Sequence, residues 1–324
     1  MSDGPHRFSR LIRIVRSRWV TIPARLVGGI IMVIAASAGS QTVADLFRPH
    51  RDQLVSTGAF VAYLAGALLV AASVTIAYVA FVRLSERRWP SELQPRAALW
   101  ELPSGIVLGF GLSAASVTVI WLLGGYQIDG VADRSTWPLL ITRGLAIAVA
   151  SSVIEEILLR GLVLRILAEG LGRWWALAIS SLLFGVLHLA NPHSSVIVAL
   201  ALAIEAGFML GVAYLWTERL WMPIGLHGAW NFALAAVFGG ALSGTEVSAI
   251  IDAKLVGPEW ISGGAFGIEG SLLSTIICCT AGLAILHEML SRSGHARSTL
   301  HRPELAQSKT EMEFKTPDDY GAEV

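Results

Sequence analysis

The sequence predicts an all-α fold, a polytopic membrane helix bundle of about eight transmembrane helices. Two observations carry this prediction. In the 324-residue chain, 54% of the residues are hydrophobic and 15% are charged, and the mean hydropathy is +0.62. This composition is far more apolar than that of a soluble globular domain. Apolar stretches near the ~20 residues that a spanning helix needs also recur along the whole chain. Nothing in the sequence indicates nucleic-acid binding.

These stretches divide the chain into three parts. We place them at 26–44, 55–82, 103–124, 137–159, 174–190, 194–216, 222–240 and 268–290. We therefore expect a basic cytoplasmic segment at 1–25, a membrane domain at 26–290 and a polar, disordered cytoplasmic tail at 291–324. The first stretch follows an arginine-rich segment and resembles a cleavable signal peptide. We expect it to be retained, because eight spans then keep both basic ends on one side.

The distribution of basic residues predicts the orientation. If the N-terminus is cytoplasmic, 19 of the 24 Lys and Arg residues lie in cytoplasmic segments and 5 lie outside. This excess agrees with the positive-inside rule. The sequence thus predicts an integral protein of the plasma membrane with both termini in the cytoplasm.

A cluster of ionisable residues interrupts the fourth stretch. It reads Glu155-Glu156-Ile157-Leu158-Leu159-Arg160, and such groups are costly in hydrocarbon unless they pair or carry function. Glu156 and Arg160 are four residues apart and share a helix face, whereas Glu155 is turned by about 100°. One interpretation is a structural ion pair with Arg160 at the cytoplasmic interface. The other is that the unpaired Glu155 performs chemistry.

Two further helices supply possible partners. Phe184 and His188 share a face of the fifth stretch, and His227 and Asn231 share a face of the seventh. Each histidine taken alone is more often a hydrogen-bonding link between helices. Together, a glutamate and a histidine can deprotonate a water, and a histidine and an asparagine can stabilise an oxyanion. These groups suffice for peptide-bond hydrolysis without a side-chain nucleophile.

The order of these motifs resembles that of the CPBP family, which comprises CAAX prenyl endopeptidases of the type II kind and bacteriocin-processing-like membrane proteases, often called Abi. The matching motifs are Glu155-Glu156-x-x-x-Arg160, Phe184-x-x-x-His188 and His227-x-x-x-Asn231. The resemblance covers roughly residues 139–240. It implies an intramembrane endopeptidase with an eight-helix bundle, whose catalytic core lies in helices four to seven, and a cavity reached from the cytoplasm.

The resemblance also implies roles for the first two motifs. Glu155 would be the general base that activates water, assisted by His188. Glu156 and Arg160 would hold the helix and orient Glu155.

The resemblance implies that His227 and Asn231 stabilise the tetrahedral oxyanion and that Phe184 packs beside the site. We expect no cofactor. Zinc is the alternative, because Glu155, His188 and His227 have the side-chain types of a His₂Glu site. The chain lacks the His-Glu-x-x-His helix typical of zinc proteases.

If every helix is perpendicular to the membrane, the predicted helix ends place the site residues at different depths. Glu155 and His227 then lie about 8 Å from the cytoplasmic face, and His188 lies about 21 Å from it. Tilts near 20° close only part of the difference. The motif match predicts that the three residues meet nevertheless.

Glu205 lies near the middle of the sixth stretch and belongs to none of the three motifs. It is either a neutral or hydrogen-bonded packing residue or a partner of His188. In the same stretch, Gly207-x-x-x-Gly211 predicts close helix packing.

The leading hypothesis is an endopeptidase acting on a membrane-associated protein or peptide, with CAAX-type proteins and bacteriocin precursors as candidate substrates. One alternative is a catalytically idle immunity or scaffold protein, which has no need of an intact set of site residues. The other is a proton-coupled transporter, for which we find neither inverted repeats nor broken helices.

Overall fold

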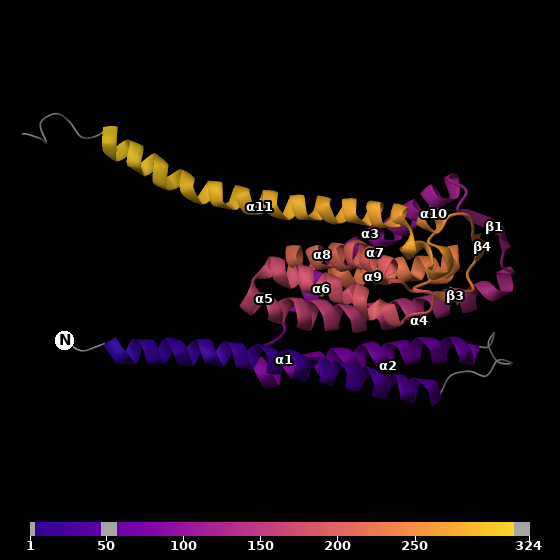
Figure 1. Cartoon of the computed structure of the whole chain (residues 1–324), viewed down its shortest axis with the longest axis horizontal. Helices are drawn as coiled ribbons and strands as arrows, with labels where there is room; N and C mark the ends of the chain where they lie inside the picture. The colour runs from indigo at the N-terminus through magenta and orange to yellow at the C-terminus, as the bar shows by residue number, and fades with distance from the viewer. Residues whose placement is uncertain (1–3, 47–56, 314–324) are drawn as a thin grey trace, which may run out of the picture.

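The structure is a computed structural model that describes the backbone of residues 4–46 and 57–313 and the side chains of residues 21–46 and 58–292. Helices α1 (Gly4–Leu46) and α2 (Thr57–Phe81) form an antiparallel pair along one flank of the bundle. Helix α11 (Leu272–Glu313) runs along the other flank (Figure 1). The remaining helices lie between these two flanks.

The central helices carry the predicted motifs. In chain order they are α3 (Pro95–Leu122), α4 (Trp137–Glu156), α5 (Arg165–Leu171), α6 (Arg173–Leu187), α7 (Val196–Leu202), α8 (Met209–Thr217) and α9 (Trp221–Phe232). Three π-helical segments interrupt or extend them: η5 (Ile157–Leu164), η7 (Ala203–Phe208) and η8 (Ala233–Phe238). Such segments are rare and often lie at functional sites.

The all-α prediction is confirmed. In the described residues, six helices are long and apolar enough to cross a membrane. They are Thr21–Leu46, Gly58–Glu86, Pro95–Leu122, Arg173–Ala190, Val196–Thr217 and Leu272–Arg292. The remaining two of the eight predicted stretches correspond to α4 and α9, the helices that carry Glu155, Glu156, His227 and Asn231. Of these two, α9 has only 12 residues before η8 begins.

The fourth helix is longer than predicted, which resolves the conflict in depth. Instead of ending at 159, the helical chain continues from α4 through η5 and α5 to Leu171. Glu155 therefore lies roughly 24 Å from the turn at Gly172, and His188 lies at a similar depth, roughly 23 Å from the start of α6. His227 follows the start of α9 by only six residues, so α9 begins deeper in the bundle than α6.

Short strands cap the end of the bundle opposite the N-terminus (Figure 1). Strands β1 (Tyr126–Val131) and β4 (Ile251–Leu255) pair antiparallel, and β2 (Gly240–Leu242) and β3 (Thr245–Val247) form a hairpin. The Tyr126 hydroxyl donates to the carbonyl oxygen of Phe238. Burial raises the pKa of Tyr126 to about 12, so the phenol remains a neutral donor at neutral pH.

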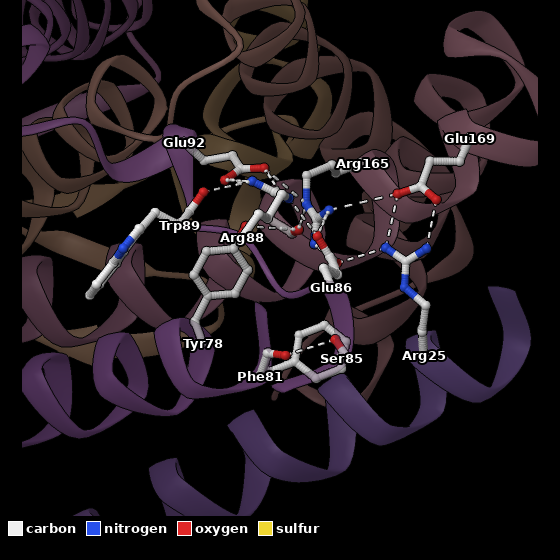
Figure 2. A network of polar contacts seen from close by, with 11 residues as sticks. Arg25, Tyr78, Phe81, Ser85, Glu86, Arg88, Trp89, Glu92, Arg165 and Glu169 are labelled. Atoms are coloured by element: carbon white, nitrogen blue, oxygen red, sulfur yellow. Dashed lines mark hydrogen bonds and ion pairs between the residues drawn. The ribbon is translucent and has the colours of Figure 1, made fainter. Parts of the chain in front are cut away.

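An ion-pair network closes the other end (Figure 2). Glu86 Oε1 lies 2.7 Å from Arg25 Nη2 and 2.7 Å from Arg165 Nη2, and Glu86 Oε2 lies 2.7 Å from Arg88 Nε. Arg88 also binds Glu92, at 2.6 Å. The network joins α1, the end of α2 and α5, so it fixes the first two helices to the motif-bearing core.

The predicted close packing at Gly207 and Gly211 is confirmed. A Cβ atom at Gly207 would approach the carbonyl oxygen of Ser181 in α6 to 2.7 Å, and one at Gly211 would approach Leu177 Cδ1 to 2.4 Å. Both approaches are closer than real side chains tolerate. The two glycines therefore allow η7 and α8 to lie directly against α6.

The helix α11 extends beyond the eighth predicted stretch, and its backbone is helical to Glu313. Residues 314–324 lie outside the described part of the chain. The side chains of the basic run before residue 21 also lie outside it.

Candidate active site

Glu156 is the centre of a fully buried charge cluster. Its Oε1 accepts hydrogen bonds from Arg160 Nη1 at 3.1 Å and from His227 Nδ1 at 2.8 Å. The pairing of Glu156 with Arg160, which the sequence spacing predicts, is thus present. It links α4 to α9 through His227.

Arg160 does not reach the cytoplasmic interface, contrary to the structural interpretation of the sequence. Its side chain is 0% exposed. Its Nη2 donates to the carbonyl oxygens of Ala206 and Gly207, both at 3.0 Å. These carbonyls belong to η7, where the π-helical turns leave backbone acceptors available to a side chain. Arg160 therefore links η5, which continues α4, to the sixth membrane helix, which consists of α7, η7 and α8 (Val196–Thr217).

Glu155 lies at the edge of this cluster. Its side chain is 29% exposed, and His227 Nε2 lies 4.0 Å from its Oε2. Among the described residues, Glu155 Oε2 has no hydrogen-bond partner. Glu155 thus does not share the ion pair of Glu156 with Arg160, as the helical spacing predicts, and its nearest ionisable neighbour is His227 of α9.

His188 has a defined tautomer. Its Nδ1 lies 2.7 Å from the carbonyl oxygen of Phe184, and a carbonyl can only accept, so Nδ1 carries the proton. That carbonyl is available because α6 ends at this turn, and the last carbonyls of a helix lack intrahelical partners. Nε2 of the neutral ring is then left as an unprotonated acceptor.

Phe184 lies between Arg160 and the two imidazoles of His188 and His227. Its ring stacks on His188 with centroids 4.7 Å apart, and it meets His227 edge-on at 6.1 Å. The guanidinium of Arg160 lies 5.1 Å from its centroid. Phe184 thus packs beside the site, as the resemblance implies, and holds both imidazoles in place.

Asn231 follows His227 by one turn on the same face of α9. Its Nδ2 donates to Ser151 Oγ at 2.9 Å, and Ser151 Oγ donates to the carbonyl oxygen of Ile147 at 2.9 Å. One N–H of the Asn231 amide remains for another acceptor. Ser151 was not predicted; its signal is that it precedes Glu155 by one helical turn.

These residues border a cavity of about 460 Å³. Its lining includes Glu155, His188 and Asn231, together with apolar side chains from α4 and α6. A second cavity of about 560 Å³ lies between α2 and α4 and also reaches Glu155. The two cavities share Ile147, Ser151 and Glu155, so α4 presents its carboxylate to both.

A hydrogen-bonded clamp at the cavity wall was missed in the sequence. Glu269 Oε2 accepts from the backbone N–H of Ser243 at 2.6 Å and from Ser243 Oγ at 2.9 Å. Asn191 Nδ2 donates to the carbonyl oxygen of Ser243 at 3.1 Å. Nothing in the helical spacing indicates contacts between such distant loops.

Glu205 is 2% exposed and accepts a hydrogen bond from Ser274 Oγ at 3.3 Å. Within the described residues it makes no hydrogen bond or ion pair with His188. The packing interpretation, in which Glu205 links the sixth membrane helix to α11, therefore agrees with the structure.

The side chains do not form the zinc site considered as an alternative. In the described part of the chain, no three His, Cys, Asp or Glu side chains come together as a possible metal site. The mechanism proposed below therefore contains no step through a metal.

The position of the cavity mouth conflicts with one expectation. Pro192 and Thr245, both exposed, border the cavity and lie in the loops at the strand-bearing end, opposite the N-terminus (Figure 1). The sequence predicts cytoplasmic termini, and the resemblance implies a cavity reached from the cytoplasm. These two expectations exclude each other in this fold.

Comparisons with known proteins support the predicted resemblance. Residues 136–233 match the sequence model of the type II CAAX prenyl endopeptidase Rce1-like family. The chain is also 28% identical over 152 residues to the uncharacterized protein YpbD of Bacillus subtilis, which corresponds to 43% of this chain and 71% of YpbD. No solved structure shows significant similarity. The family match contains all seven predicted site residues.

Proposed function

We propose that the chain hydrolyses a peptide bond of a membrane-associated protein or peptide with a water activated by Glu155 and His188; the match of residues 136–233 to the Rce1-like endopeptidase family supports this proposal. The observation that carries the proposal is the carboxylate of Glu155, whose Oε2 has no hydrogen-bond partner among the described residues, on a cavity that His188 also borders. An ionisable group inside a membrane bundle is a candidate functional residue, because burying it is costly.

The first step is the attack of water. Glu155 accepts a proton from a water in the cavity, and the water oxygen bonds to the carbonyl carbon of the scissile peptide. His188 accepts a hydrogen bond from the same water through Nε2, the unprotonated ring nitrogen. General-base assistance of this kind contributes about 10²–10⁴-fold in rate.

The second step is stabilisation of the tetrahedral oxyanion. Asn231 offers the amide N–H that Ser151 leaves unused. His227, whose Nδ1 donates to Glu156, offers Nε2–H when its ring is protonated. Loss of one such donor typically costs about 10²–10³-fold. Collapse of the intermediate then transfers the proton held by Glu155 to the leaving amine.

Glu156 and Arg160 act as positioning residues. Glu156 holds His227, and Arg160 holds Glu156 and the backbone of η7. Neither reaches the substrate in this mechanism. They hold α4, α9 and the sixth membrane helix in fixed positions relative to one another around the cavity.

The test compares full-length wild type with Glu155→Gln in membranes and identifies the new N-termini of membrane peptides by mass spectrometry. The expected result is a set of cleavage products that is absent with Glu155→Gln. The matched control is Glu288→Gln, an exposed carboxylate on α11 that pairs with Arg292 and should leave the products unchanged. Identical products from wild type and Glu155→Gln would refute the proposal.

A further inference from the structure

The bundle is closed at one end and open at the other. Below the site, towards the terminus-bearing end, η5 and its neighbours form a layer of side chains that are 0% exposed, among them Ile157, Leu162 and Leu164. The ion-pair network of Figure 2 lies beyond this layer. Among the described residues, this layer separates Glu155 from that end of the bundle.

The opposite end offers a path. The cavity is bordered there by Pro192 and by the hairpin residues Ser243 and Thr245. Leu187 and Ile147, which also line the cavity, are 52% and 37% exposed. The cavity is thus bordered by exposed residues at the strand-bearing end.

The two ends differ in basic charge. At the closed end, the ion-pair network contains Arg25, Arg88 and Arg165 (Figure 2). Arg83 and Arg87 lie close to the network residues Glu86 and Arg88 in the chain, and Arg173 begins α6 beside the turn that follows α5. At the open end the described basic side chains are Arg134, Arg143 and Lys254. Arg160, counted in the sequence as cytoplasmic, is buried beside the site and favours neither side. The positive-inside rule counts Lys and Arg near the ends of the spans and places the closed end in the cytoplasm.

We propose that the cavity is entered from the extracytoplasmic side of the membrane, and that its substrate is an exported or membrane-anchored polypeptide whose scissile bond is presented from that side. This inference rests on the proposed function for the cleavage itself. A prenylated C-terminus in the cytoplasm would face the closed end of the bundle. The apolar cavity wall, with Leu158, Leu187 and Leu242 beside the polar site, suits a segment that leaves the outer half of the bilayer.

The orientation is tested by cysteine labelling, which requires no catalytic activity. The native cysteines, Cys278 and Cys279, are both unpaired and are replaced by alanine. Thr245→Cys then reports the open end and Ser91→Cys the closed end. Both are near-isosteric changes at exposed positions that leave all Lys and Arg residues in place.

A membrane-impermeant maleimide is applied to intact cells and, in parallel, to lysed cells. We expect Thr245→Cys to react in intact cells and Ser91→Cys to react only after lysis. The reverse pattern, or equal labelling of both variants in intact cells, would overturn the proposal. The outcome does not depend on whether any peptide is hydrolysed, so it is separable from a failure of the proposed function.

A second experiment tests the side of cleavage. A library of random ten-residue segments is placed beside a single transmembrane anchor, either outside or inside the cytoplasm, and is co-expressed with wild type or Glu155→Gln. We expect wild type to cleave members of the outside library only. Cleavage confined to the inside library would overturn the orientation. Cleavage of neither library by wild type would count against the peptidase function, while the labelling would still decide the orientation.

Discussion

Replacing Glu155 and Glu156 one at a time by glutamine separates chemistry from folding in two neighbouring carboxylates. Each change removes a negative charge and retains the side-chain shape. We expect Glu155→Gln to abolish hydrolysis without loss of stability. We expect Glu156→Gln to destabilise the fold, because its charge neutralises a buried guanidinium.

The magnitudes follow from burial and pairing. Glu156 and Arg160 are both 0% exposed, and their charged atoms lie 3.1 Å apart. Removing one partner of a buried ion pair typically costs about 3–5 kcal/mol, which lowers Tm by on the order of 10 °C. Glu155 is 29% exposed and its Oε2 has no partner among the described residues. Its replacement should change the stability by no more than about 0.5 kcal/mol while the rate falls about 10²–10⁴-fold.

The assay follows thermal unfolding in detergent by the fluorescence of the 11 tryptophans, and kcat/KM on a cleaved reporter peptide. The double variant Glu156→Gln, Arg160→Met serves as the internal control. It removes the charge left unpaired by the single change and should recover part of the lost stability.

Two results would refute this reasoning. If Glu155→Gln hydrolysed the reporter at the wild-type rate, Glu155 would not be the general base. If Glu155→Gln and Glu156→Gln had the same Tm, the ion pair of Glu156 with Arg160 would not contribute to the stability of the fold.

Three further predictions concern the rest of the site. His188→Ala should lower kcat about 10²–10⁴-fold and Asn231→Ala about 10²–10³-fold, both with small changes in KM; steady-state kinetics that show a change in KM alone would assign these residues to binding. Gly207→Ala should lower Tm and activity together, because the new Cβ would meet the Ser181 carbonyl and displace the backbone that holds Arg160; an unchanged Tm in the unfolding assay would contradict the close packing. A chelator should leave the activity of the purified protein unchanged, as measured by initial rates with elemental analysis of the same sample, whereas a loss that zinc restores would favour the His₂Glu alternative.

Local spacing determined much of the candidate site. Residues four apart on a helix share a face whatever the tertiary structure, so the pairing of Glu156 with Arg160 and the stacking of Phe184 on His188 followed from the sequence. The isolation of Glu155 followed from the same period. Because apolar length alone identifies most spanning helices, the all-α membrane fold was also predictable.

Only the tertiary structure decided how these faces meet and from where they are reached. The continuation of the fourth helix to Leu171 places Glu155 at the depth of His188. Gly172, with φ of 80°, ends this helix, but the spacing of the apolar residues alone did not show that the helix continues that far. The clamp between Ser243 and Glu269 joins loops 26 residues apart, beyond the range of helical periodicity. The position of the cavity mouth, at the end away from the termini, likewise depends on packing, because the buried layer around Ile157, Leu162 and Leu164 lies on the other side of the site. Spacing along one helix is a local property, whereas depth, contact and access depend on the packing of all the helices together.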